Sequence, residues 1–224
     1  MRKLLKPILA LALLGGLALA DQFDLDNNQA EVQQRINLTI PQRVALHLTE
    51  DEWILDLNNP PLGNQGEGCY LVPKGDQRTL EQLIQAALAG QLQPVGTYPA
   101  IRDLNGDGRI TDDEKGSLIC LNQKVLQKFC NNRDGCELDL KVTRTHGGPT
   151  YGKAGVVDKA PSINHEKFVQ INGNDQGQPL ELLRVVGQRL PGWLDDLIIE
   201  AFWFDGSEVA GTYEFNFNFI LVAL

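Results

Sequence analysis

Apolar and polar residues alternate in several separate stretches of this chain, and this period of two limits its possible folds more than any other feature. The alternation is clearest in residues 137–144, where Leu138, Leu140 and Val142 are separated by polar residues. It recurs in residues 213–219, where aromatic side chains alternate with Glu and Asn. Such a pattern is typical of strands that place one face in a core and the other in solvent. The chain is therefore expected to form antiparallel sheets.

Shorter stretches with strand character occur on both sides of the middle of the chain. They are residues 32–40, 44–48, 53–57, 180–186 and 197–204. Residues 145–155 contain four glycines and a proline, a composition that indicates a loop. Residues 131–135 have the composition of a turn. The aromatic stretch 213–219 is predicted to be a core strand. Pairing of that stretch with a neighbouring subunit remains an alternative.

The middle of the chain changes to helical periodicity. Residues 79–89 place apolar side chains at the three- and four-residue spacing of a helix face, and Thr79 with Gln82 forms a capping box before the stop at Gly90. A second helix is expected to begin at Thr111. Its buried face would consist of Leu118, Leu121, Val125 and Phe129.

Residues 103–114 carry oxygen-bearing side chains at the spacing of a twelve-residue calcium loop. Gly108, at the sixth position, allows the sharp turn that such a loop needs. The predicted ligands are Asp103, Asn105, Asp107, the backbone carbonyl of Arg109, Thr111 and Glu114. Calcium is a hard cation that prefers six to eight oxygen ligands. An Asx-rich turn before a well-capped helix is the alternative interpretation of the same residues.

This segment resembles the EF-hand family over residues 103–129, specifically its loop and exiting helix. The resemblance implies Ca²⁺ as a cofactor. It does not extend to an entering helix, because Pro94, Gly96 and Pro99 precede the loop. The chain has no second good loop, and a lone loop implies a structural ion rather than a switch.

Together these patterns predict one domain that spans residues 21–224 and is mainly β with a helical insertion, an α+β chain. Its expected form is an antiparallel, immunoglobulin-like β-sandwich. Residues from about 60 to 135 would form an inserted segment with two helices and the calcium loop. The N-terminal strands alone are too few to enclose a stable core, which disfavours two separate domains.

Four cysteines, Cys69, Cys120, Cys130 and Cys136, allow three disulfide pairings. A helix running from Cys120 to Cys130 would hold these two about 15 Å apart, whereas a disulfide needs Cα atoms within roughly 7 Å. We therefore favour Cys69–Cys120 with Cys130–Cys136. The pairing of Cys69 with Cys130 and of Cys120 with Cys136 remains open. A zinc site is disfavoured because no Cys-x-x-Cys pair occurs.

The N-terminus indicates export. Residues 1–20 have a basic start, an apolar run and a small-x-small end, which predicts a signal peptide of bacterial style. Its removal takes away Arg2, Lys3 and Lys6 and leaves 17 basic against 29 acidic residues, a net charge of −12. Such a chain would repel nucleic acid. We expect no transmembrane segment after cleavage and a periplasmic, cell-surface or secreted location.

No catalytic residue can be assigned from motifs, because the chain has neither Gly-x-Ser-x-Gly nor a phosphate-binding glycine loop. The favoured function is that of an exported, non-catalytic calcium-binding protein with a structural, adhesion or assembly role in the cell envelope. Its partner would be another protein, or a further copy of the chain held through an edge strand. A secreted, calcium-stabilised hydrolase of carbohydrate is the main alternative. A calcium-responsive regulator is the third.

Overall fold

The computed structural model describes residues 35–63, 66–146 and 153–224, and the expected signal peptide lies outside them. The chain divides into two compact units, Met1–Ile40 and Pro41–Leu224. In the first unit, residues 35–40 form neither strand nor helix, and Ile36, Leu38 and Ile40 are exposed. The strand expected over residues 32–40 is therefore wrong for residues 35–40, while residues 32–34 lie outside the described part.

The second unit consists mainly of β-strands. They are β1 (Val44–Leu48), β2 (Gly68–Pro73), β3 (Gln93–Pro94), β4 (Ala100–Ile101), β5 (Lys115–Cys130), β6 (Gly135–His146), β7 (Ala154–Ala160), β8 (His165–Ile171), β9 (Pro179–Val186), β10 (Trp193–Phe204) and β11 (Glu214–Ala223). Helix α1 (Leu80–Leu88) and two 3-10 turns, η1 (Pro161–Ile163) and η2 (Gly173–Asp175), complete the described elements.

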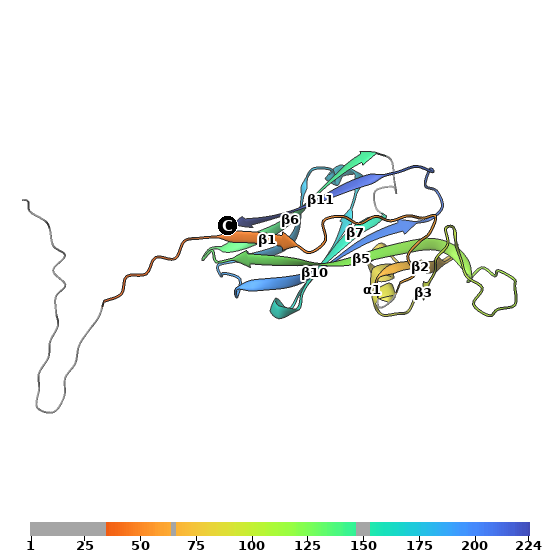
Figure 1. Ribbon diagram of the computed structural model, residues 1–224, viewed down its shortest axis with the longest axis horizontal. Coiled ribbons are helices and arrows are strands. Elements are labelled where there is room, and N and C mark those ends of the chain that lie inside the picture. The colour runs from red at the N-terminus through yellow and green to blue at the C-terminus, as the bar shows by residue number, and fades with distance from the viewer. Residues whose placement is uncertain (1–34, 64–65, 147–152) are drawn as a thin grey trace, which may run out of the picture. The chain divides into compact units, whose positions relative to one another are not determined.

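The strands form two antiparallel sheets (Figure 1). The larger has eight strands in the order β3-β2-β5-β10-β7-β8, with β1 and β4 also paired to β5. The smaller has three in the order β11-β6-β9. Side chains from both sheets share one apolar core, including Leu126 of β5, Leu140 of β6 and Leu182 of β9. The predicted mainly antiparallel β fold is confirmed, and the arrangement is consistent with a β-sandwich.

The opposite face of the large sheet carries a second core beneath α1. Leu83 and Ile84 of the helix pack there with Tyr70, Ile119 and Ile199 from three strands. The capping box predicted at the start of this helix is confirmed. The Thr79 hydroxyl accepts a hydrogen bond from the Gln82 backbone, and the Gln82 side chain accepts one from the Thr79 backbone.

The second predicted helix is wrong, because residues 115–130 form the sixteen-residue strand β5. This strand pairs with β10 along one edge and with β1 and β2 along the other. The expected two-helix insertion is corrected accordingly. Residues 60–135 contain a single described helix and contribute the central strand of the large sheet.

Two features explain why the sequence of β5 lacks the alternation of a strand: residues 118–121 are buried on both faces, and Lys124 and Lys128 are buried on the core side of the rest. Leu118 and Leu126 face the core between the sheets, whereas Ile119 and Leu121 lie under α1. A strand covered on both sides loses its alternation of apolar and polar residues. The remaining pattern of Leu118, Leu121, Val125 and Phe129 then matches a helix face by coincidence.

Other predicted strands show mixed outcomes. Those at residues 44–48, 137–144, 180–186, 197–204 and 213–219 are confirmed by β1, β6, β9, β10 and, from residue 214, β11. Phe215, Phe217 and Phe219 of β11 pack against the main core, as predicted. Residues 53–57 form no strand, although their alternate apolar side chains also pack there. Strands β2, β7 and β8 were not predicted.

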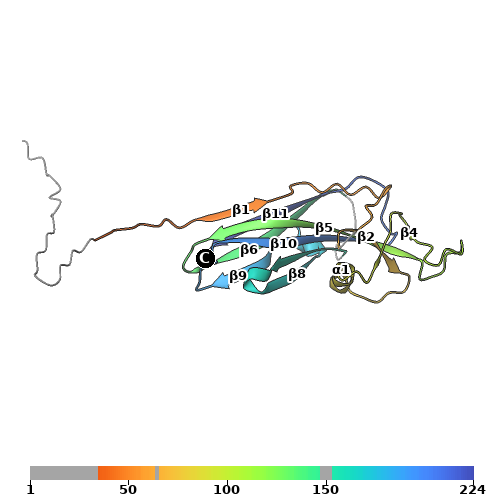
Figure 2. The same cartoon turned by 60° about the horizontal axis from the view of Figure 1, so that its bottom comes forward.

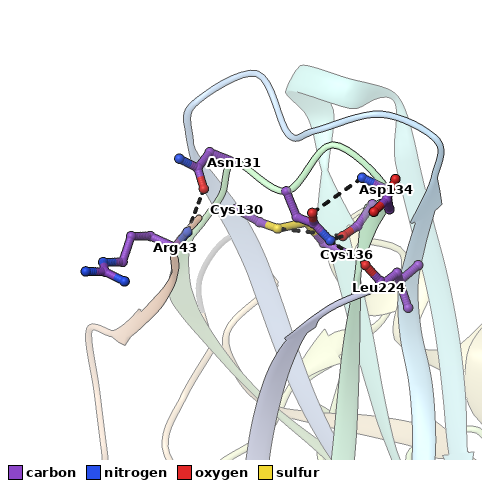
Figure 3. Close-up of a disulfide and its surroundings, with 8 residues drawn as sticks. Arg43, Cys130, Asn131, Asp134, Cys136 and Leu224 are labelled. Carbon is purple, nitrogen blue, oxygen red and sulfur yellow. Dashed lines mark hydrogen bonds between the residues drawn. A yellow bond between two sulfur atoms is a disulfide. The ribbon is translucent and has the colours of Figure 1, made fainter. Parts of the chain in front are cut away.

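The favoured disulfide pairing is confirmed. Cys69 and Cys120 lie directly opposite each other on β2 and β5, with Cα atoms 4.0 Å apart. Cys130 and Cys136 join the end of β5 to the start of β6, with Cα atoms 6.5 Å apart (Figure 3). The second bond therefore ties the large sheet to the small one. A strand from Cys120 to Cys130 separates these two residues even further than the expected helix would have done.

The close pairing of β2 and β5 leads to a prediction about Gly116. A Cβ atom at this position would lie 1.9 Å from the Val72 carbonyl oxygen, so Gly116→Ala must push the strands apart. We expect a loss of about 1–3 kcal/mol in the free energy of unfolding, measured by thermal or denaturant melts. Gly211→Ala is the control, because its nearest new contact would be at 3.4 Å. Equal stability of the two variants would contradict the prediction.

Candidate functional site

The twelve residues of the predicted calcium loop connect β4 to β5 at the end of the large sheet away from the β5–β6 turn (Figure 2). The flanking residues are paired as in a hairpin, with Ile101 opposite Lys115. The Arg102 backbone N–H also donates to the Glu114 carbonyl oxygen at 2.7 Å. The antiparallel ladder therefore holds the two ends of the loop together.

Side chains at the first half of the loop turn inward to the backbone. The two Asp103 carboxylate oxygens accept hydrogen bonds from the N–H groups of Gly106 and Gly108, at 2.6 and 2.9 Å. Both glycines have positive φ angles, 73° and 76°, which favour glycine over other residues. Asn105 and Asp107 each accept from the N–H group two residues further on. Each of these three side chains thus organises the turn that follows it.

Glu114 closes the loop from its other end. One of its carboxylate oxygens accepts from the Leu104 N–H at 2.7 Å, and the other accepts from the Thr111 N–H at 3.0 Å. The Thr111 hydroxyl lies 2.7 Å from the same oxygen. The backbone N–H of Thr111, followed by its hydroxyl and the Leu104 N–H, holds the pKa of Glu114 below its usual value. This carboxylate is therefore ionised whenever the loop is closed at neutral pH.

The six predicted ligands all lie within this loop, and their donors are oxygens, as calcium prefers. The loop conformation fits the ion in two respects: the required glycine has a positive φ angle, and the twelfth residue reaches back to the second. Among the residues that the structure describes, however, no three His, Cys, Asp or Glu side chains converge as a ready metal centre. The carboxylate oxygens of Asp103, Asp107 and Glu114 instead accept hydrogen bonds from backbone N–H groups of the loop.

The resemblance to the EF-hand needs a correction at the exit of the loop. Residues 115–129 form most of β5 rather than a helix, so only residues 103–114 retain the resemblance. The capping features at Thr111 and Glu114 are real hydrogen bonds, but they close a hairpin loop instead of starting a helix.

A cluster of buried charges lies elsewhere, between the sheets, and sequence analysis missed it. Lys128 of β5 contacts Asp196 of β10 directly and lies 3.9 Å from Asp158 of β7. All three side chains are 0% exposed. His165 of β8 approaches Asp158 at 3.5 Å and lies 2.9 Å from the Leu182 carbonyl oxygen. The missed signal was strand parity, because Lys128, Asp158 and Asp196 each lie on the same side of their strand as apolar core residues, which include Leu126, Val156 and Ile198.

A second ion pair occupies the same face of the sheet. Lys124 of β5 lies 2.9 Å from Glu200 of β10, and both side chains are almost fully buried. Burial raises the pKa of Glu200, while the Lys124 contact opposes that rise. Glu50, whose charge also raises this pKa, is exposed and accepts a hydrogen bond from Asn122.

An open surface depression at the base of the loop is lined in part by Asp76 and Asp205. These two carboxyl groups are the candidates for catalysis if the protein is a carbohydrate hydrolase. Asp76 pairs with Arg78, and Asp205 pairs with Lys153. Hydrogen bonding to the Lys153 ammonium lowers the pKa of Asp205 to about 2, and Arg78 lowers that of Asp76. A general acid for glycoside hydrolysis requires a raised pKa, so this pair is poorly suited to the reaction.

Comparison with family models, curated proteins and solved structures gave no match to this chain. Within the described residues, no helix has the length and apolar character needed to cross a membrane.

The lowered pKa of Glu114 predicts a pH-dependent contribution to stability. Because the folded-state pKa is depressed, the contribution is present above the usual carboxyl pKa and disappears as pH falls through the lowered value. Glu114→Gln should lower the melting temperature at pH 7, and the gap to wild type should close on acidification. Melts of Asp113→Asn, in the same loop, are the control and should show a smaller shift. A gap that persists unchanged at acid pH would contradict this account.

Proposed function

We propose that this protein is an exported, non-catalytic β-sandwich that binds one structural Ca²⁺ ion and serves as a structural, adhesion or assembly component of the cell envelope. The loop at residues 103–114 carries the proposal. It places oxygen-bearing residues at every ligand position of a twelve-residue calcium loop, and its turn has the required glycine conformation. The sandwich is proposed to be immunoglobulin-like, in keeping with its two antiparallel sheets.

The residues that would hold the ion are Asp103, Asn105, Asp107, the Arg109 carbonyl, Thr111 and Glu114. Bound calcium would supply a fixed positive charge among carboxylates that otherwise repel one another. The antiparallel β4–β5 pairing keeps the first and last ligands close before any ion arrives. An ion held in this way would stabilise the hairpin and the start of β5, and would have no part in catalysis.

Export is supported by the N-terminal sequence and by two disulfides, which form in oxidising compartments. The proposed partner is another protein or a second copy of the chain. Strand β8 ends the order of the large sheet, and β9 and β11 end that of the small one. Sheet edges of this kind offer backbone groups for pairing with another strand.

The decisive test is calorimetric calcium titration of the oxidised protein, with melts in calcium and in chelator. We expect one site. If its dissociation constant is about 0.1 mM, millimolar calcium should raise the free energy of unfolding by roughly 1.4 kcal/mol. Asp107→Ala and Glu114→Ala should abolish both effects. Asp113→Ala, at a loop position that supplies no ligand, is the matched control and should retain them.

Three outcomes would redirect the proposal. Absence of binding at millimolar calcium would leave the loop as an Asx-rich turn that is closed by Glu114 alone. Hydrolysis of oligosaccharides that depends on Asp76 or Asp205 would favour the secreted carbohydrate hydrolase instead. A large change in scattering or circular dichroism on calcium binding would favour a regulator.

A further inference from the structure

The buried charge cluster brings an amine and two carboxyl groups together in the space between the sheets. Lys128, Asp196 and Asp158 come from β5, β10 and β7, which are adjacent in the large sheet. Lys128 contacts Asp196 directly, and its Nζ lies 3.9 Å from an Asp158 carboxylate oxygen. All three side chains are completely buried, so water does not compete for these groups.

As an ionic arrangement this cluster is poorly satisfied. Both oxygens of Asp158 and one oxygen of Asp196 accept no hydrogen bond. A buried ion pair is favourable only when further hydrogen bonds satisfy its remaining atoms. Two carboxylates beside one ammonium would also leave a net negative charge in the core. Burial therefore favours a state in which fewer of these three side chains are charged than in water.

Burial shifts the protonation of Asp158 and Lys128 in the direction that removes charge. It raises the pKa of the Asp158 carboxyl, although Lys128 and His165 act against that rise. It also lowers the pKa of the Lys128 ammonium to about 8. A neutral amine is a nucleophile, and a neutral carboxylic acid is a proton donor. The core thus favours the uncharged forms of Lys128 and Asp158, which are a nucleophilic amine and an acid able to transfer a proton.

We propose that Lys128 and Asp196 condense to form an intramolecular isopeptide bond, with Asp158 as the group that transfers protons. The Lys128 and Asp196 side chains are already in contact, so no change in the sheet is needed to bring the reacting groups together. Holding two reactants in this way replaces a bimolecular encounter with a step inside one molecule. The bond would link residues 68 positions apart on adjacent strands.

The reaction balances without any further reactant. Neutral Lys128 Nζ forms a bond to Asp196 Cγ, with Asp196 in its acid form, and the acid proton of Asp158 passes to the Asp196 carbonyl oxygen. Asp158 carboxylate then removes one proton from the nitrogen. The Asp196 Cγ atom now carries two hydroxyl groups. Asp158 returns its proton to one of them, which leaves as water, and takes the proton of the other, which restores the carbonyl. One N–C bond forms, one C–O bond breaks, and Asp158 ends as it began.

The Lys124–Glu200 pair supplies an internal comparison. Its lysine and acid occupy the same two strands and the same face of the sheet, and they are also buried. The further acid that acts on this pair is Glu50, which is exposed and bonded to Asn122. Within the described residues, no further buried acid acts on this pair to transfer protons, and we expect it to remain ionic.

Intact-mass spectrometry of the reduced full chain, followed by proteolytic mapping, tests the proposal. Wild type should be lighter by one water molecule than Lys128→Arg, after allowance for the substitution. Its digest should contain a branched peptide that joins the β5 and β10 segments. Lys124→Arg, the matched control, should keep the loss of water and the branched peptide. The comparison between variants is unaffected by any processing of the N-terminus, because all share it.

Each outcome decides a part of the proposal. Wild type with the full mass and no branched peptide would show an ordinary buried ion pair and overturn the bond. In Asp158→Asn, with its fold checked by circular dichroism, most molecules should show the full mass, without the loss of water that condensation causes. Complete condensation in that variant would overturn the role of Asp158. Because the wild-type mass is measured directly, the bond itself is decided even when a variant fails to fold.

Discussion

Burial of β5 on both faces is the constraint on which the rest of the structure depends. One face lines the core between the sheets, and the other lies beneath α1. Along its edges the strand pairs with β10 and with β1 and β2. Residues 118–121 of this sixteen-residue strand are buried on both faces, and a shift of one residue would exchange those faces and turn Lys124 and Lys128 out of the core. Each disulfide has one of its cysteines on this strand, Cys120 or Cys130.

The loop at residues 103–114 depends on the same strand. In an EF-hand the calcium loop lies between helices, whereas here a ladder of β4 and β5 brings its ends together. Glu114, which closes the loop, is the residue immediately before β5. The Cys69–Cys120 bond fixes β2 beside the same part of the strand. The proposed calcium ion would therefore act on a hairpin that the sheet already holds in place.

Strand parity also determines what the core contains. Lys124 and Lys128 are four residues apart on β5, so both face the same side of the sheet, toward the acids of β10. One pair has a buried acid from β7 beside it, whereas the acid that acts on the other among the described residues, Glu50, is exposed. Two similar pairs in the same core thus differ in their surroundings. For this reason we propose a covalent bond for Lys128–Asp196 and an ion pair for Lys124–Glu200. In the proposed structural role, a covalent bond between neighbouring strands would oppose their separation.

The sequence by itself predicted the features that depend on local chemistry. The capping box of α1 needs only Thr79 and Gln82, and the turns of the loop need only Asp103 and its following glycines. Alternation revealed β6 and β11, because each has one face in the core. Cysteine spacing also led to the observed disulfide pairing, although the helix used in that argument proved to be a strand.

Only the tertiary structure decided the features that depend on what covers each face. A strand beneath a helix on one side and a second sheet on the other has no alternation to reveal it, so β5 resembled a helix. Lys128, Asp158 and Asp196 are distant in sequence, and the local sequence around each one does not indicate the other two. Their meeting results from the order β5-β10-β7, which hydrogen bonding between distant strands establishes.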